Sequence, residues 1–211
     1  MAFLPGDPPA HDGGYEAGYR SCPCFWGTEP ASLVRLLVSQ VAVRDWRVLD
    51  LGCGEGKNAA FLAERGANVI AVDVSDAAIA NGNSIWPDTP GIEWRVADVM
   101  PQEFSDGEFD LVVAYGLFHC LESESIEPLI KRVKGWTRAG GRNVVVAFND
   151  RAQDLAGHPG FCPTLLTHQF YLGQYSDWRL DVATDQDLVE RHPNNEIEHS
   201  HSLTRLIATR R

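Results

Sequence analysis

Basic side chains are scarce in this sequence. Its 211 residues include 18 lysines and arginines against 29 aspartates and glutamates, which gives a formal net charge of −11. Nucleic-acid binding depends on lysine and arginine neutralising phosphates, and the chain has no basic cluster that would offset the overall repulsion. The composition therefore argues against nucleic acid as a partner and favours a small molecule, in particular a neutral or cationic one.

Long apolar runs and a cysteine framework are also missing. No apolar run approaches the ~20 residues of a membrane span, and residues 1–7 lack both the basic start and the apolar stretch of a signal peptide. The five cysteines are odd in number and scattered, which argues against a disulfide framework. We expect a protein of the cytoplasm with no membrane contact, and no feature of the sequence selects an oligomeric state.

The most informative segment that is present runs from Val48 to Gly56. An apolar run that contains Asp50 is followed by glycines at every second position, 52, 54 and 56. Behind them, residues 57–65 predict a helix and residues 67–72 predict a strand that leads to Asp73. A doubly wound sheet uses this order of strand, glycine turn, helix, strand and acid to hold an adenosine-containing ligand at the carboxyl ends of its strands.

The spacing of the glycines restricts the kind of ligand. A dinucleotide-binding G-x-G-x-x-G turn would place its third glycine at position 57, which is Lys57, whereas the third glycine comes one residue earlier at Gly56. No G-K-S or G-K-T follows, so the phosphate-binding loop of nucleotide hydrolases is absent too. The turn therefore disfavours a pyrophosphate-containing cofactor.

Strands and helices alternate along residues 29–211, which predict a single α/β domain behind an N-terminal segment of residues 1–28. Because the chain closes with two strands that have no helix between them, we expect a three-layer, mostly parallel sheet with an antiparallel last strand. The expected strands are residues 47–51, 67–72, 92–96, 109–115, 143–148, 178–189 and 203–209. Helices are expected at residues 57–65, 124–136 and 164–173. Two more are expected, one that residues 29–32 open and one that Ser75 caps.

The run from Asp50 to Asn58, D-L-G-C-G-E-G-K-N, resembles motif I of the class I S-adenosylmethionine-dependent methyltransferases. The resemblance extends over about residues 31–148. Motif I and the Phe61–Gly66 run most resemble those of the small tellurite-resistance-type bacterial methyltransferases. The closing segments Glu190–Pro193 and His199–His201 are similar to those of many bacterial members. The resemblance implies a Rossmann-like seven-stranded sheet and S-adenosylmethionine as cofactor.

Three acids are expected at three parts of that cofactor. In the family, the position of Asp50 helps to hold the amino acid end, and Asp98 matches an acid that accepts a hydrogen bond from the adenine amine. Asp73, at a strand end, is placed to accept both ribose hydroxyls. An alternative for Asp98 is that it only caps a turn before Pro101. The full set expected to contact the cofactor is Asp50, Gly52, Cys53, Gly54, Gly56, Asn58, Asp73, Val74, Asp98, Val99 and Tyr115.

Catalytic residues are harder to identify, because a methyl group on a sulfonium is already activated and alignment alone can accelerate its transfer. Tyr115 and His119 follow the fourth expected strand, where substrate and methyl group meet in this family. His119 is the best candidate for a general base because its charge changes near neutral pH. The alternative is that His119 packs beside the cofactor. The absence of D-P-P-Y or N-P-P-Y here argues against methylation of base amines.

Residues 1–28 are rich in aromatic residues, glycine and proline, and we interpret them as a lid over the cofactor. The lid would place Tyr15, Tyr19 and Trp26 in the substrate pocket. Cys22 and Cys24 lie within it, but their spacing differs from the C-x-x-C of zinc or redox sites, so we expect incidental packing.

His199 and His201 would face the same side of a strand, as substrate-contacting residues or metal ligands do. We expect substrate contact from them and no metal site.

The leading hypothesis is therefore a methyltransferase that uses S-adenosylmethionine to methylate an oxygen, nitrogen or sulfur atom of a small molecule. A non-catalytic module that binds the same cofactor is the main alternative. A nicotinamide-dependent oxidoreductase is less favoured because of the glycine spacing.

Overall fold

The computed structural model of the chain describes residues 13–155, 163–192 and 195–211. Residues 1–12 of the segment expected to form a lid lie outside the described residues. So does Pro193, the last residue of the closing segment Glu190–Pro193. The helices are α1 (Glu16–Ser21), α2 (Ser32–Gln40), α3 (Lys57–Ala63), α4 (Asp76–Ile85), α5 (Ser123–Trp136) and α6 (His168–Gln174), with a 3-10 turn η1 (Phe118–Cys120). The strands are β1 (Arg47–Leu51), β2 (Asn68–Asp73), β3 (Ile92–Val96), β4 (Phe109–Tyr115), β5 (Thr137–Gln153), β6 (Arg179–His192) and β7 (Asn195–Thr209).

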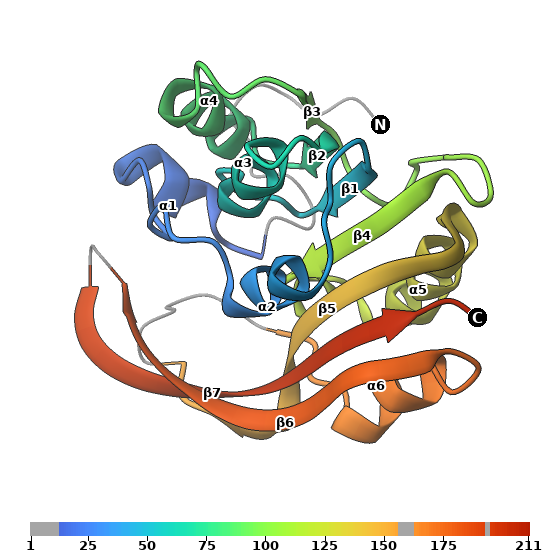
Figure 1. The fold of residues 1–211 in the computed structure, drawn as a ribbon. Helices are drawn as coiled ribbons and strands as arrows, with labels where there is room; N and C mark the ends of the chain where they lie inside the picture. Colours follow the sequence, from blue (N-terminus) through green and yellow to red (C-terminus); the bar gives the residue numbers. More distant parts are fainter. Residues whose placement is uncertain (1–12, 156–162, 193–194) are drawn as a thin grey trace.

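The strands form one seven-stranded sheet in the order β3-β2-β1-β4-β5-β7-β6. Neighbours from β3 to β5 pair in parallel, and β7 pairs antiparallel with both β5 and β6. The predicted sheet, mostly parallel with an antiparallel last strand, is confirmed. Figure 1 shows β6 and β7 as a long curved hairpin that reaches past the central strands on the side of α1.

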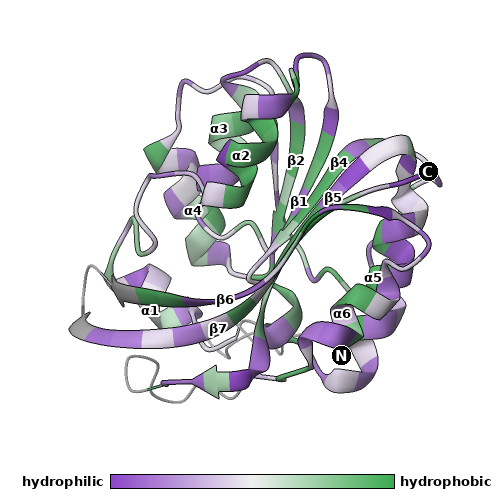
Figure 2. Cartoon of the chain, turned by 60° about the horizontal axis from the view of Figure 1, so that its bottom comes forward, coloured by the Kyte–Doolittle hydropathy of each residue, from purple (hydrophilic) through white to green (hydrophobic). Residues whose placement is uncertain are grey.

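Both faces of the central strands are buried. On β1, Val48 packs into a core with α2 and α3, whereas its neighbour Leu49 packs into a second core with α5 and α6. Because both faces are covered, these strands are nearly continuous apolar runs, as Figure 2 shows for β1, β2 and β4. This is why their positions were predictable from the sequence alone.

The outer strands are longer than the sequence indicates. β5 begins at Thr137 and continues to Gln153, beyond the expected 143–148, because its pairing with β4 and β7 extends past the apolar residues. β7 begins at Asn195 instead of 203, since its polar first half pairs with β6. α6 begins at His168 and not at the expected residue 164. The hydroxyl of Thr167 caps the helix by accepting the Phe170 N–H at 2.9 Å.

The N-cap predicted at Ser75 is confirmed, because its hydroxyl accepts the backbone N–H of Ala78 at 2.9 Å. None of the helices in the described part of the chain combines the length and the apolar character that crossing a membrane requires.

Candidate functional site

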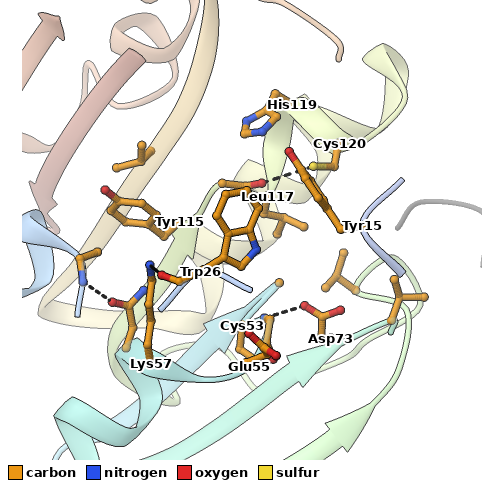
Figure 3. A pocket seen from close by; sticks show the side chains of 18 of the residues that line it. Tyr15, Trp26, Cys53, Glu55, Lys57, Asp73, Tyr115, Leu117, His119 and Cys120 are labelled. Atoms are coloured by element: carbon orange, nitrogen blue, oxygen red, sulfur yellow. Dashed lines mark hydrogen bonds between the residues drawn. The ribbon is translucent and has the colours of Figure 1, made fainter. Parts of the chain in front are cut away.

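A cavity of about 300 Å³ opens at the carboxyl ends of the central strands. We call one side the loop half; it is lined by Gly52, Cys53, Gly54, Asp73, Val74, Asp98 and Val99. The other side, the apolar half, is lined by Leu117, Leu121, Val146, Phe148, Leu188 and Leu203, with Tyr115, His119 and Cys120 as its polar members. Figure 3 shows His119 and Cys120 at one end of the cavity and Cys53, Glu55 and Asp73 at the other.

Asp73 is the best-anchored acid of the loop half. One carboxylate oxygen accepts the backbone N–H of Gly54 at 2.7 Å and the other accepts that of Ser75 at 2.9 Å. Burial raises the pKa of Asp73, and the two backbone hydrogen bonds partly offset this effect. The carboxylate is thus fixed at the end of β2 and faces the cavity, where the sequence predicts it.

Asp50 lies behind the loop, and the described residues that line the cavity do not include it. It is almost fully buried, and its Oδ2 accepts no hydrogen bond from any described residue. Burial, together with the nearby charge of Asp73, raises the pKa of Asp50 from 3.8 to about 7. A buried carboxylate oxygen without a donor among the described residues requires an explanation, such as a bound ligand or an ordered water.

Asp98 lines the cavity together with Val74 and Val99, two other residues expected to contact the cofactor. The alternative reading also holds, because its Oδ1 accepts the backbone N–H of Met100 at 2.8 Å and so closes the turn that leads to Pro101. The two interpretations are compatible: the turn orients the carboxylate, and the carboxylate borders the cavity.

Gly56 and Asn58, both expected to contact a cofactor, take part in packing or hydrogen bonds within the protein. Gly56 does not line the cavity; a Cβ there would overlap the indole ring of Trp94, and its φ of +77° lies in the left-handed region. Asn58 does line the cavity, but its Oδ1 accepts the backbone N–H of Ala31 at 2.9 Å and thereby fastens the start of α2. The glycine spacing therefore reflects packing as well as ligand access.

Replacing Gly56 with alanine is expected to destabilise the protein by about 2–4 kcal/mol, because alanine strains the left-handed backbone and displaces Trp94. Urea unfolding followed by tryptophan fluorescence measures this change. Gly173→Ala is the control, since a Cβ there has no neighbour within 4 Å and the site is helical. If Gly56→Ala lowers the free energy of unfolding no more than Gly173→Ala does, the packing of Trp94 does not require glycine at position 56.

The aromatic residues of the N-terminal segment lie over the loop half. Trp26 Nε1 donates to the hydroxyl of Tyr19 at 3.0 Å, and a Cβ on Gly54 would come within 2.9 Å of that hydroxyl. Tyr15 meets Trp26 edge to face at 5.2 Å. All three predicted aromatics line the cavity, but Tyr19 lies against the glycine loop, on the cofactor side of the expected pocket.

Polar contacts that the sequence did not indicate fasten this segment. The Lys57 ammonium donates to the backbone oxygen of Trp26 at 3.0 Å. The buried Glu55 accepts through Oε1 from the Cys24 N–H at 2.8 Å and from the Asn81 amide at 2.9 Å. Residues 13–28 are therefore tied to α3 and α4 by groups at the glycine loop itself.

His119, the candidate general base, lies in the wall of the apolar half and is 3% exposed. Its Nδ1 accepts the backbone N–H of Phe148 at 3.1 Å, and its ring stacks on the ring of Phe148 at 4.1 Å. A ring nitrogen that accepts a backbone N–H carries no hydrogen of its own, so this contact fixes the tautomer of His119. Tyr115 also lines the cavity, at the end of β4.

His199 and His201 are not among the described residues that line the cavity, so their expected contact with a substrate gains no support from the structure. His201 stacks on Phe148 at 4.2 Å, and its Nδ1 bonds to the Gln153 side-chain oxygen at 2.8 Å. His199 is buried against His201, with ring centres 5.0 Å apart. Both side chains are buried on β7, where His201 pairs with Gln153 of β5 and with Leu188 of β6. No group of three His, Cys, Asp or Glu side chains suited to a metal is found among the residues described.

The sequence analysis did not identify three residues that line the cavity, namely Phe148, Leu188 and Leu203. They come from β5, β6 and β7, and no short motif marks them. Only the prediction that two closing strands return beside β5 could have indicated them.

Comparison with known proteins is consistent with this arrangement. Residues 48–141 match the family model described as a methyltransferase domain. An uncharacterized methyltransferase of Mycobacterium tuberculosis, Rv0089, is 34% identical over 113 residues, which are 54% of this chain and 56% of the relative. A probable S-adenosyl-L-methionine-dependent methyltransferase of Haemophilus influenzae, TehB, is 28% identical over 155 residues, which are 71% of this chain and 51% of the relative.

The chain thus spans about half the length of these curated relatives. The crystal structure of TehB from Haemophilus influenzae superposes with a TM-score of 0.72 at 21% identity, covering 84% of this chain and 61% of that one.

Proposed function

Because this chain belongs to the class I S-adenosylmethionine-dependent methyltransferases, and within them to the tellurite-resistance type, we propose that it methylates a small molecule seated in the apolar half of the cavity. S-adenosylmethionine is its cofactor. The observation that carries the proposal is that one cavity joins the glycine loop and its acids to a separate apolar wall.

The residues of the loop half fit this cofactor. Its fixed carboxylate, Asp73, suits a ribose diol, and Asp98 beside Val99 offers an acceptor next to an apolar surface for adenine. Asp50, whose Oδ2 accepts no hydrogen bond within the described part of the chain, suits the positively charged amino acid end. When bound, the cofactor supplies a methyl group activated by its sulfonium.

The apolar half suits the non-reacting body of an acceptor. Its six aliphatic and aromatic members come from β5, β6, β7 and the residues that flank η1. Tyr115 and His119 add polar side chains, and the ring of His119 is held by the Phe148 N–H. A sealed cofactor site would favour the non-catalytic alternative, whereas here the two halves are continuous. Residues 13–28 cover the loop half and, in this proposal, serve as a lid that keeps water from the cofactor.

The test of a small-molecule acceptor is methyl transfer from S-adenosylmethionine labelled in the methyl group. The full chain is incubated separately with the metabolite, RNA, DNA and protein fractions of a bacterial extract, and label is counted in each. The proposal expects label only in the metabolite fraction. Label in RNA, DNA or protein would contradict it.

Replacing Leu188 with tryptophan is expected to fill the apolar half. Labelling of the metabolite fraction should fall at least about tenfold while the affinity for S-adenosylmethionine stays unchanged, because Leu188 borders only the apolar half. Val189→Trp is the matched control: the neighbouring side chain points to the opposite face of β6 and is 61% exposed. Equal activity in the two variants would show that the acceptor does not occupy this half.

A further inference from the structure

We propose that Tyr19 is a cofactor-binding residue, and that its hydroxyl donates a hydrogen bond to the carboxylate at the amino acid end of S-adenosylmethionine. Tyr19 comes from the N-terminal segment, and this role rests on the proposed function, in which the loop half holds the cofactor. It concerns the loop half alone and is independent of the acceptor. The contacts of Tyr19 with the glycine turn and with its neighbours support it.

The hydroxyl of Tyr19 lies directly on the glycine turn. At Gly56 the absent side chain leaves room for the ring of Trp94, and at Gly54 it leaves room for a polar group. A Cβ on Gly54 would come within 2.9 Å of the Tyr19 hydroxyl oxygen. Tyr19 also lines the cavity. This hydroxyl is therefore part of the surface that the turn presents to a ligand.

The same hydroxyl accepts one hydrogen bond and has its own hydrogen left to donate. Its oxygen accepts the indole N–H of Trp26 at 3.0 Å. A phenol both accepts and donates, but no acceptor for the hydrogen of Tyr19 is found in the described part of the chain. Tyr19 is only 7% exposed, and a buried polar hydrogen without an acceptor is rare. An acceptor on a bound ligand accounts for it.

The phenol of Tyr19 keeps this hydrogen at neutral pH. Burial raises the pKa of Tyr19 well above its ordinary value of 10.0, and the charge of Asp73 raises it further. The hydrogen bond from Trp26 lowers the pKa, but it is a smaller effect than either of these. Tyr19 is therefore a neutral donor among acids.

The acids around this donor determine which group of the cofactor it meets. Asp73 lies close enough to Tyr19 and to Asp50 to raise the pKa of each. Glu55 lines the loop half as well, and its charge also acts on Tyr19. Ionised carboxylates only accept hydrogen bonds, so they suit the ammonium and hydroxyl groups of the cofactor. The carboxylate of the cofactor needs donors instead, and a neutral phenol is one.

The covalent structure of the cofactor keeps its carboxylate at this turn. The ammonium and the carboxylate are bonded to the same carbon atom, so an ammonium near Asp50 brings the carboxylate to the same part of the cavity. Lys57 is the competing candidate, because it lines the cavity too. Its ammonium donates to the backbone oxygen of Trp26 at 3.0 Å (Figure 3). The hydroxyl of Tyr19 is the group that lies on Gly54 itself.

Helix α4 holds both the donor and the nearby acid in place. The side-chain amide of Asn81 on α4 donates to the backbone oxygen of Tyr19 at 2.8 Å. The hydroxyl of Ser75, which caps α4, donates to Glu16 of α1, and its backbone N–H donates to Asp73 at 2.9 Å. Tyr19 and Asp73 are therefore positioned by one helix and meet the cofactor as a preformed surface.

Titration calorimetry with two ligands separates this role from a structural one. The ligands are S-adenosylmethionine and its decarboxylated analogue, which keeps the ammonium and the sulfonium but lacks the carboxylate. Tyr19→Phe removes only the hydroxyl. We expect the variant to bind S-adenosylmethionine at least about tenfold more weakly than the unmodified protein does, and to bind the analogue equally well.

Tyr171→Phe is the matched control. Its hydroxyl is also buried and has no hydrogen-bond partner in the described part of the chain, but Tyr171 lies on α6 and is not among the described residues that line the cavity. This variant should bind both ligands as the unmodified protein does. Lys57→Met is measured in parallel to test the competing donor.

Three results would overturn the role of Tyr19 and leave the proposed function standing. One is unchanged binding of S-adenosylmethionine by Tyr19→Phe, and another is an equal loss for both ligands, which would mean that the hydroxyl only supports packing. The third is a loss that depends on the carboxylate in Lys57→Met and not in Tyr19→Phe. Failure of the unmodified protein to bind S-adenosylmethionine would overturn the proposed function as well.

Discussion

Replacing Asp73 with alanine is expected to lower the affinity for S-adenosylmethionine by about two orders of magnitude. Hydrogen bonds to a charged group contribute roughly 1.5–3 kcal/mol each, and tenfold in affinity is about 1.4 kcal/mol. The carboxylate is held in place by the N–H groups of Gly54 and Ser75, so the cofactor meets it without reorganisation. Titration calorimetry of the cofactor-free protein measures the effect.

Two further variants make this result specific. Asp73→Asn keeps the size of the side chain and an oxygen acceptor, and should lose less affinity than alanine. Asp76→Ala removes an exposed carboxylate a few residues away that pairs with Arg20, and should leave the affinity unchanged. Binding by Asp73→Ala as tight as that of the unmodified protein would remove Asp73 from the cofactor site.

Replacing Asp50 with asparagine is expected to stabilise the cofactor-free protein at alkaline pH. In the folded state the pKa of Asp50 is raised from 3.8 to about 7, chiefly by burial. Between these values the folded protein holds a proton that the unfolded chain has released, so stability falls as the pH rises from about 4 to 7 and is then level. Asparagine is neutral throughout and avoids this loss.

The size of the effect follows from the shift. From pH 5 to pH 8 the advantage of Asp50→Asn should grow by roughly 3 kcal/mol, at 1.36 kcal/mol per pKa unit, which corresponds to about 5–10 °C in melting temperature for a domain of this size. Thermal unfolding at the two pH values measures it.

The same substitution should weaken cofactor binding, because the positive amino acid end loses a carboxylate behind the loop. An advantage that does not change between pH 5 and pH 8 would mean that Asp50 is ionised in the folded protein.

The local features of this fold could be predicted from the sequence because they are coded in short segments. The central strands are apolar runs, Ser75 is a hydroxyl before a helix, and the glycine turn brings Asp73 to the cavity within about twenty residues of chain. The parallel order then follows from the alternation of strands and helices. For the same reason the loop half of the cavity was largely predictable.

The apolar half could not be predicted because it depends on contacts between distant parts of the chain. Phe148 reaches the cavity through the pairing of β4 with β5, and Leu203 through the antiparallel return of β7. His201, which the alternation of polar residues had suggested as a substrate contact, is buried on the same strand. The tautomer of His119 depends on a backbone N–H 29 positions away, which no local pattern reveals.

The most direct test of the account is calorimetric titration of the unmodified chain with S-adenosylmethionine and, separately, with NADH. The loop half, with Lys57 at the place where a pyrophosphate-binding turn requires glycine, predicts saturable binding of S-adenosylmethionine at one site and none of NADH. Absence of S-adenosylmethionine binding, or binding of NADH in its place, would contradict it.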